Sequence, residues 1–109
     1  MERTLSQIQK EVDDWAQQFE KPYFEPLSMM ATMTEEVGEV ARVMNHLFGD
    51  KKKKDGETLK DLQEELADVM FTIICIANDQ KISLDKAFQQ KIEKLYGRDN
   101  NRFERKDSV

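Results

Sequence analysis

Cysteine, histidine, proline and glycine are scarce in this sequence, and their scarcity excludes several kinds of site. The 109 residues include one cysteine, one histidine, two prolines and four glycines. Because Cys75 has no second cysteine to pair with, no intrachain disulfide can form, and one Cys with one His supplies too few ligands for a zinc site. The sequence also has no Gly-rich phosphate loop, no Glu-x-x-His pair for a di-iron bundle, and no Ser-His-Asp set.

Long apolar runs are also lacking. The longest, at residues 69–77, is broken only by Thr72 and is much shorter than the roughly 20 residues that cross a bilayer. The first fifteen residues have no apolar core resembling a signal peptide. We therefore expect a cytoplasmic protein without a membrane partner. Its formal net charge of −5 argues against a general nucleic-acid binder, since no global basic field exists.

Apolar residues recur at helical spacing along the chain and nowhere alternate as in strands. Pro26 suits the first turn of a helix, Thr58 with Asp61 forms a variant capping box, and Ser83 is a plausible N-cap. We expect one all-α domain over residues 1–109, packed as a four-helix bundle. Its predicted helices lie near residues 4–20, 26–48, 58–79 and 83–96, and a charged tail follows at 98–109.

Two apolar surfaces follow from this periodicity. On the first helix, Trp15 and Phe19 are expected in the core rather than in a base-stacking site, with contact to a nucleobase as the alternative for either ring. The inner face of the second helix is predicted to carry Leu27, Met30, Met33, Val37, Val40, Met44 and Leu47. Residues 69–77 are apolar almost all the way round and need cover on every side, which a thin bundle of this size does not provide. We therefore predict a dimer or tetramer with this segment at the subunit interface.

Four acidic side chains form two matched pairs, Glu36 with Glu39 and Glu65 with Asp68. In each pair a spacing of three places the carboxylates on one helical face, one turn apart. Apolar neighbours such as Met33 flank Glu36, where an unpaired charge is costly. Two such pairs on facing helices form an all-oxygen cage suited to Mg²⁺ or Mn²⁺. Such ions commonly serve phosphoryl chemistry.

An anionic substrate would also need cations from the protein. The candidates near the end of the fourth helix are Lys91, Lys94, Arg98 and Arg102, and the linker lysines at 51–54 are weaker ones. His46 follows Glu39 by two turns on nearly the same face, a position close enough to line a pocket above the metal. We expect it instead to be packed or solvent-exposed, without a role in the site.

The pattern Glu35-Glu36-x-x-Glu39, a spacer, then Glu65-x-x-Asp68 resembles the signature of the MazG-like nucleotide pyrophosphohydrolases. This all-α superfamily also holds dimeric dUTPases and phosphoribosyl-ATP pyrophosphohydrolases. The surrounding segments MTEEVGEVARVMNH and EELADVMFTIICIAN fit it too.

The resemblance implies hydrolysis of a nucleoside triphosphate between its α and β phosphates, giving the monophosphate and pyrophosphate. It assigns Mg²⁺ to Glu36, Glu39, Glu65 and Asp68, so that Glu36 takes part in catalysis, and it gives Glu35 the role of positioning or deprotonating water. It also implies dimers or tetramers whose neighbouring subunits complete each site, and a possible role in removing noncanonical nucleotides.

Two alternatives remain open from the sequence. One is phosphoribosyl-ATP hydrolysis, which differs only in substrate. The other is a non-enzymatic helical module that binds a nucleotide or a protein, favoured by the apolar third helix and by the methionines of the second, which suit an adaptable interface.

Overall fold

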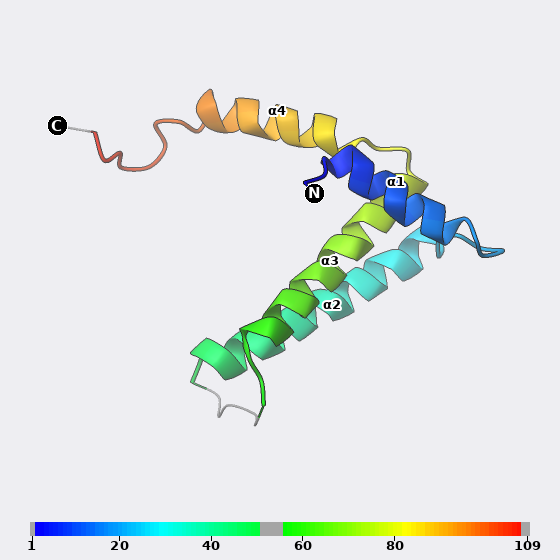
Figure 1. Cartoon of the computed structure of the whole chain (residues 1–109). Coiled ribbons are helices and arrows are strands. Elements are labelled where there is room, and N and C mark those ends of the chain that lie inside the picture. The colour runs from blue at the N-terminus through cyan, green and yellow to red at the C-terminus, as the bar shows by residue number, and fades with distance from the viewer. Residues whose placement is uncertain (1, 51–55, 108–109) are drawn as a thin grey trace.

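The described part of the chain folds into four α-helices, and one of them extends away from the rest as an arm (Figure 1). The computed structural model describes residues 2–50 and 56–107 and contains no strand in that part of the chain. The helices are α1 (Leu5–Ala16), α2 (Pro26–Phe48), α3 (Leu59–Asp79) and α4 (Leu84–Tyr96). The all-α prediction is confirmed. The linker lysines at 51–54 lie outside the described residues.

The helices begin where local capping chemistry places them. The Thr58 hydroxyl accepts a hydrogen bond from the backbone N–H of Lys60, and the Asp61 carboxylate accepts one from the N–H of Thr58 at 2.7 Å. Ser83 caps α4 by accepting from the N–H of Lys86. Pro26 stands at the first turn of α2, where its missing N–H costs no helical hydrogen bond.

Helix α1 ends at Ala16, four residues before the predicted boundary at residue 20. Residues 17–23 turn instead, and Pro22 lies in this segment. The turn is fixed by Tyr23, whose hydroxyl donates to Asp13 Oδ1 at 2.5 Å and so draws the chain back toward α1. A contact between residues ten positions apart therefore overrides the helical periodicity that continues through Phe19.

Helices α2 and α3 pack antiparallel along their length, and α1 crosses the C-terminal part of α3 (Figure 1). Helix α4 packs mainly against α1 and points away from the α2–α3 pair. Within a single chain, the four helices therefore do not pack together as the predicted four-helix bundle. The reason is visible on α4, where Phe88, Ile92 and Leu95 remain exposed because no helix of the same chain covers them.

One buried amide fixes the corner from which the arm leaves. Gln9 of α1, only 9% exposed, donates to Asn78 Oδ1 at 3.0 Å and to the carbonyl of Ile82 at 2.8 Å. The side-chain oxygen of Gln9, Oε1, accepts a hydrogen bond from the backbone N–H of Leu84 at 2.9 Å. The end of α3 and the start of α4 are thus both tied to α1.

The chain exposes far more surface than a compact protein of its mass. Its radius of gyration is 17.8 Å, against about 13 Å for a compact domain of this length. Its accessible surface is 9039 Å², against about 6,300 Å² expected for 12.8 kDa. Much of the apolar surface that would normally lie in a core is therefore uncovered.

Helix α2 carries two apolar faces, and the predicted inner face is in large part the exposed one. Met29 and Val43 are buried against the rest of the chain. The exposed face has large apolar side chains three, seven, seven and four residues apart in turn, which are spacings found along a coiled-coil seam. Its large apolar members are Leu27, Met30, Val37, Met44 and Phe48.

The apolar segment at residues 69–77 is partly covered within one chain. Thr72, Ile74 and Ala77 are buried, whereas Met70 and Phe71 are more than 40% exposed. No helix in the described ranges is long and apolar enough to cross a membrane.

Candidate functional site

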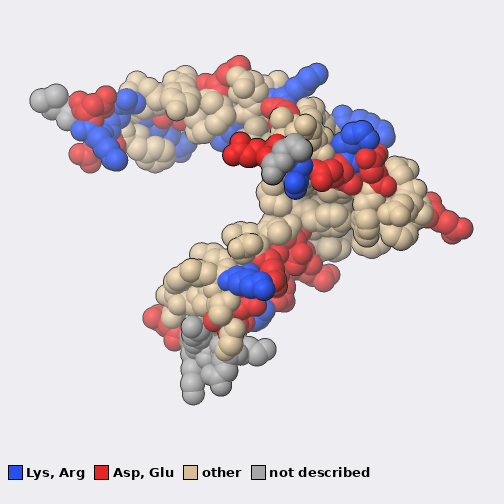
Figure 2. Space-filling view, viewed as in Figure 1, with Lys and Arg blue, Asp and Glu red and all other residues tan. Residues whose placement is uncertain are grey.

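Three of the predicted metal ligands come together where α2 faces α3. Glu36 from α2 and Glu65 and Asp68 from α3 each offer a carboxylate oxygen, and these oxygens all lie within 4.8 Å of one another. Glu36 and Glu65 are half-buried, whereas Asp68 is exposed. Figure 2 shows acidic side chains gathered over the middle of the α2–α3 pair. We call Glu36, Glu65 and Asp68 the acid group.

The acid group has the donor set of a hard divalent cation, because all its ligand atoms are carboxylate oxygens. Its electrostatics agree with that fit. Burial raises the pKa of Glu65, and the negative charges of Asp68, Glu39 and Glu36 raise it further. Crowded carboxylates of this kind are relieved by a cation between them.

The other two predicted acids lie beside the acid group rather than in it. Glu39 is exposed, and its Oε2 accepts a hydrogen bond from Arg42 Nε at 3.0 Å. It is nevertheless close enough for its charge to raise the pKa of Glu65. Glu35, next to Glu36 on α2, is exposed. The structure thus brings three of the predicted metal ligands together, and it places the fourth, Glu39, beside that group and in contact with Arg42.

A second charged cluster adjoins Glu39 and was not foreseen from the sequence. The Arg42 guanidinium bonds Glu39 through Nε and Glu57 through Nη1. The second oxygen of Glu57 lies 3.0 Å from His46 Nδ1. Burial raises the pKa of Glu57, but the hydrogen bonds from Arg42 and His46 more than offset this and lower its pKa below the usual value. We call Glu57, Arg42 and His46 the Glu57 cluster.

One half of this cluster carried a sequence signal. The spacing of three between Glu39 and Arg42 is a standard helical ion pair. Glu57 carried none, because it sits in a charged linker and meets Arg42 only when α3 folds back along α2. His46 is packed, as expected, since its side chain is only 9% exposed.

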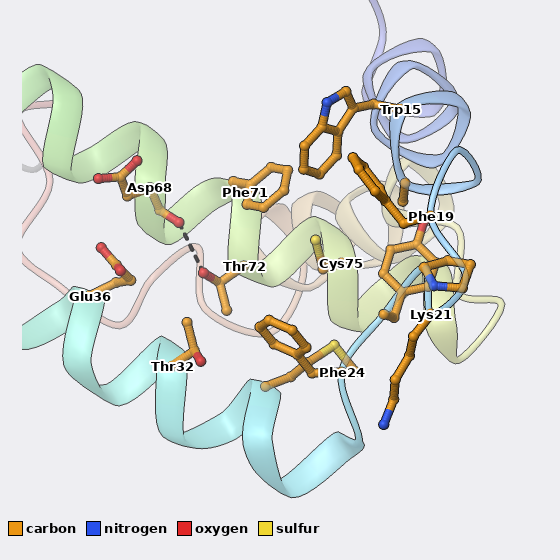
Figure 3. Close-up of a pocket in the computed structure, with 14 residues that line it drawn as sticks. Trp15, Phe19, Lys21, Phe24, Thr32, Glu36, Asp68, Phe71, Thr72 and Cys75 are labelled. Carbon is orange, nitrogen blue, oxygen red and sulfur yellow. Dashed lines mark hydrogen bonds between the residues drawn. The ribbon is translucent and has the colours of Figure 1, made fainter.

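An aromatic pocket opens beside the acid group (Figure 3). Its volume is about 490 Å³, and Glu36 and Asp68 stand at one end. Thr32 and Thr72 lie next to them, and the Thr72 hydroxyl donates to the backbone carbonyl of Asp68 at 3.0 Å. Trp15 and Phe19 lie at the far end, and three more aromatic side chains line the pocket, namely Tyr23, Phe24 and Phe71.

The predicted core role of Trp15 and Phe19 is wrong. Their side chains are 54% and 50% exposed and line the pocket. Trp15 packs edge-on against Phe19, with ring centroids 5.0 Å apart, and against Phe71 at 6.0 Å. Because α1 ends at Ala16, Trp15 lies in its last turn and Phe19 in the bend that follows, and both rings line the pocket instead of continuing a helix into the core.

The predicted phosphate-binding cations do not meet the acid group within one chain. Lys91 and Lys94 lie on the α4 arm, which packs on α1. Beyond it, Arg98 bonds Asp99 and the Arg102 guanidinium lies over the Phe103 ring at 5.5 Å.

Sequence comparisons identify relatives over most of the chain. A model of the MazG nucleotide pyrophosphohydrolase domain matches residues 24–103, a range that contains the acid group and the Glu57 cluster. YpjD from Bacillus subtilis (strain 168), an uncharacterized protein, is 45% identical over 106 residues, which cover 97% of this chain and 96% of YpjD.

Solved structures agree with this result. The crystal structure of YpjD from Bacillus subtilis superposes with a TM-score of 0.81 at 46% identity, covering 86% of this chain and 96% of that one. A Bacillus-conserved MazG protein, described as a nucleotide pyrophosphohydrolase, superposes with a TM-score of 0.76 at 41% identity, covering 86% of this chain and 90% of its own.

Proposed function

The chain belongs to the MazG nucleotide pyrophosphohydrolase family, and from that premise we propose that it hydrolyses nucleoside triphosphates between the α and β phosphates, releasing a nucleoside monophosphate and pyrophosphate. Family membership makes it a hydrolase of nucleotide pyrophosphate bonds, which sets the non-enzymatic module aside. The observation that carries the finer proposal is the acid group at one end of an aromatic pocket. A nucleotide has the matching polarity, with an apolar base at one end and phosphates at the other.

The proposed cofactor is Mg²⁺, with Mn²⁺ as a substitute. Glu36, Glu65 and Asp68 would hold it, and Glu39 is the proposed fourth ligand. When bound, the ion neutralises phosphate charge and lowers the pKa of an attacking water. Support comes from the carboxylate-only donor set and from the raised pKa of Glu65.

The protein's own groups then act around the phosphates. Glu35 is exposed one turn before Glu39, and its proposed role is to orient or deprotonate water on the solvent side of α2. The aromatic end of the pocket would take the base, since stacking on exposed rings such as Trp15 and Phe19 contributes about 1–3 kcal/mol per base. Such stacking tolerates different bases, in keeping with the predicted role in removing noncanonical nucleotides.

The proposed active form is a homo-oligomer, a dimer or a tetramer. The exposed coiled-coil-like face of α2 and the uncovered apolar side chains of α4 support it, because contiguous apolar surface of this kind marks interfaces. In such an assembly the α4 arm of one subunit can reach the acid group of another. That arrangement is the proposed route by which Lys91, Lys94, Arg98 and Arg102 contact substrate phosphates.

A cytoplasmic location stays a prediction, in keeping with the single cysteine. Absence of membrane and nucleic-acid partners stays a prediction too.

The test is a pyrophosphate-release screen of the full chain over canonical and modified nucleoside triphosphates with Mg²⁺. We expect pyrophosphate and monophosphate, with little orthophosphate. Release of orthophosphate alone, or no release with any divalent ion from a folded oligomer, would overturn the proposal. Activity on phosphoribosyl-ATP with none on the panel would decide for the alternative substrate.

A further inference from the structure

We propose that Glu57 is a positioning residue for the metal centre: it holds the Arg42 guanidinium, which in turn fixes the carboxylate of Glu39 beside the acid group. This inference rests on the proposed function, because it concerns how a divalent cation is bound. It assigns a role to a residue that lies outside both acidic pairs, just before α3 begins.

The connection is continuous through hydrogen bonds. Arg42 Nε donates to Glu39 Oε2 at 3.0 Å, and Arg42 Nη1 donates to Glu57 Oε1. Glu57 Oε2 in turn meets His46 Nδ1 at 3.0 Å. A planar guanidinium bonded at two positions has its orientation set, so the Glu39 oxygen that it bonds is set as well. The other oxygen of Glu39 is left for a ligand role.

Burial distinguishes this pair from an ordinary surface salt bridge. Glu57 is 8% exposed and the His46 side chain 9%, so the carboxylate that holds Arg42 is itself enclosed. In the exposed ion pair of Lys10 with Asp14, by contrast, both side chains are more than 60% exposed, and such a pair constrains little. An enclosed carboxylate with both oxygens bonded has few alternative conformations.

The location of Glu57 explains why such a link is useful. Glu36 and Glu39 come from α2, whereas Glu65 and Asp68 come from α3, so the site requires the two helices to be in register. Glu57 belongs to the α3 side of the connection and binds two residues of α2. It therefore ties the start of α3 to the helix that carries Glu39. Groups that hydrogen-bond a metal ligand without binding the metal themselves typically affect metal affinity about 10- to 100-fold.

The test measures Mn²⁺ binding to the full-length protein by titration calorimetry, without substrate. We expect Glu57→Ala to weaken binding about 10- to 100-fold. Glu57→Gln is expected to retain part of the affinity, because its amide oxygen can still accept from Arg42. Arg42→Lys should resemble Glu57→Ala, since an ammonium group cannot bond two carboxylates as a planar fork does.

The matched control is Asp61→Ala. Asp61 closes the capping box at the same end of α3, so its loss loosens that end without touching Arg42. We expect its Mn²⁺ affinity to stay at the wild-type value. An equal loss in this variant would show that Glu57 merely supports the helix, and would overturn the proposal.

A double-mutant cycle tests whether Glu57 acts through Glu39. In a Glu39→Gln background, Glu57→Ala should cause little further loss, because the ligand that it positions is already gone. An undiminished loss there, or wild-type affinity in Glu57→Ala alone, overturns the inference while leaving the proposed function intact. If the wild type binds no Mn²⁺ at all, the proposed function fails together with it. Should Glu57→Ala not fold, Glu57→Gln and Arg42→Lys carry the same cycle.

Discussion

Glu36 on α2 and Asp68 on α3 face each other at the end of the aromatic pocket, each contributing an oxygen to one group with Glu65 (Figure 3). Neither carboxylate has a basic partner among the ion pairs of the described residues. The pair is therefore poised to hold a cation and is under mutual repulsion without one.

Replacing both carboxylates by neutral isosteres, as Glu36→Gln with Asp68→Asn, should lower turnover by about 100-fold or more and remove Mg²⁺ binding. The helices should stay intact, because neither side chain caps a helix. Without metal, the variant should melt a few degrees higher than the wild type, since like charges have been removed from one site. Circular dichroism melts with and without Mg²⁺, together with pyrophosphate release, measure all three effects. Wild-type turnover in this variant would contradict the role given to the acid group.

The raised pKa of Glu65 predicts how the metal-free protein responds to pH. A carboxyl whose pKa is higher in the folded state than in the unfolded state contributes stability below its ordinary pKa of 4.5. That contribution is lost as the pH rises through the raised value. In the presence of a chelator, Glu65 should therefore add a downward slope to the melting temperature as the pH rises above 4.5. Glu65→Gln should reduce this slope, and saturating Mg²⁺ should do the same in the wild type. An unchanged slope in Glu65→Gln would assign the effect to other groups.

The hydrogen bond between Tyr23 and Asp13 predicts an alkaline transition. Burial, and then the bond to Asp13, raise the pKa of Tyr23 to about 12. The same bond, followed by one from Gln17, lowers the pKa of Asp13. Stability linked to Tyr23 is present below pH 10, its ordinary pKa, and is lost as the pH rises toward about 12.

Ultraviolet difference titration of tyrosinate should show this late step, and Tyr23→Phe should abolish it. The matched control is Tyr96→Phe, whose side chain is exposed on α4 and should leave the step in place. Persistence of the step in Tyr23→Phe would show that the hydrogen bond does not govern the ionisation.

A charge on the exposed face of α2 should break the proposed oligomer. Val37 lies in the middle of that face, so Val37→Glu would be tolerated in a single chain but not in a packed seam. We expect sedimentation to shift toward the monomer and pyrophosphate release to fall in parallel. Ser28→Glu places the same charge on another face of the helix and should change neither. If the Val37→Glu variant sediments as an oligomer of the wild-type size, this face is not the subunit interface.

Local chemistry made the helices predictable. Pro26, Thr58, Ser83 and Gly97 all stand at the ends of helices, where their backbone preferences act without help from distant residues. The acidic pairs were predictable for the same reason, because a spacing of three on a helix fixes a shared face.

Long-range contacts defeated the sequence-based prediction. The turn after Ala16 depends on Tyr23 reaching Asp13, and the Glu57 cluster depends on α3 lying along α2. Helix α2 has apolar residues on two faces, and periodicity alone does not say which face meets α3. That ambiguity explains why Val37 and Met44, predicted inside, are on the outside of a single chain.

Gln9 sets the direction of α4 by bonding both to the end of α3 and to the N–H of Leu84. The arm is thus held in place before any second subunit arrives. In the proposed assembly, the loss of conformational freedom along the arm occurs when each chain folds, so association begins from a preorganised shape. An arm held rigidly in this way favours one geometry of subunit pairing over others. The side-chain amide of Gln9 is the group that fixes its direction.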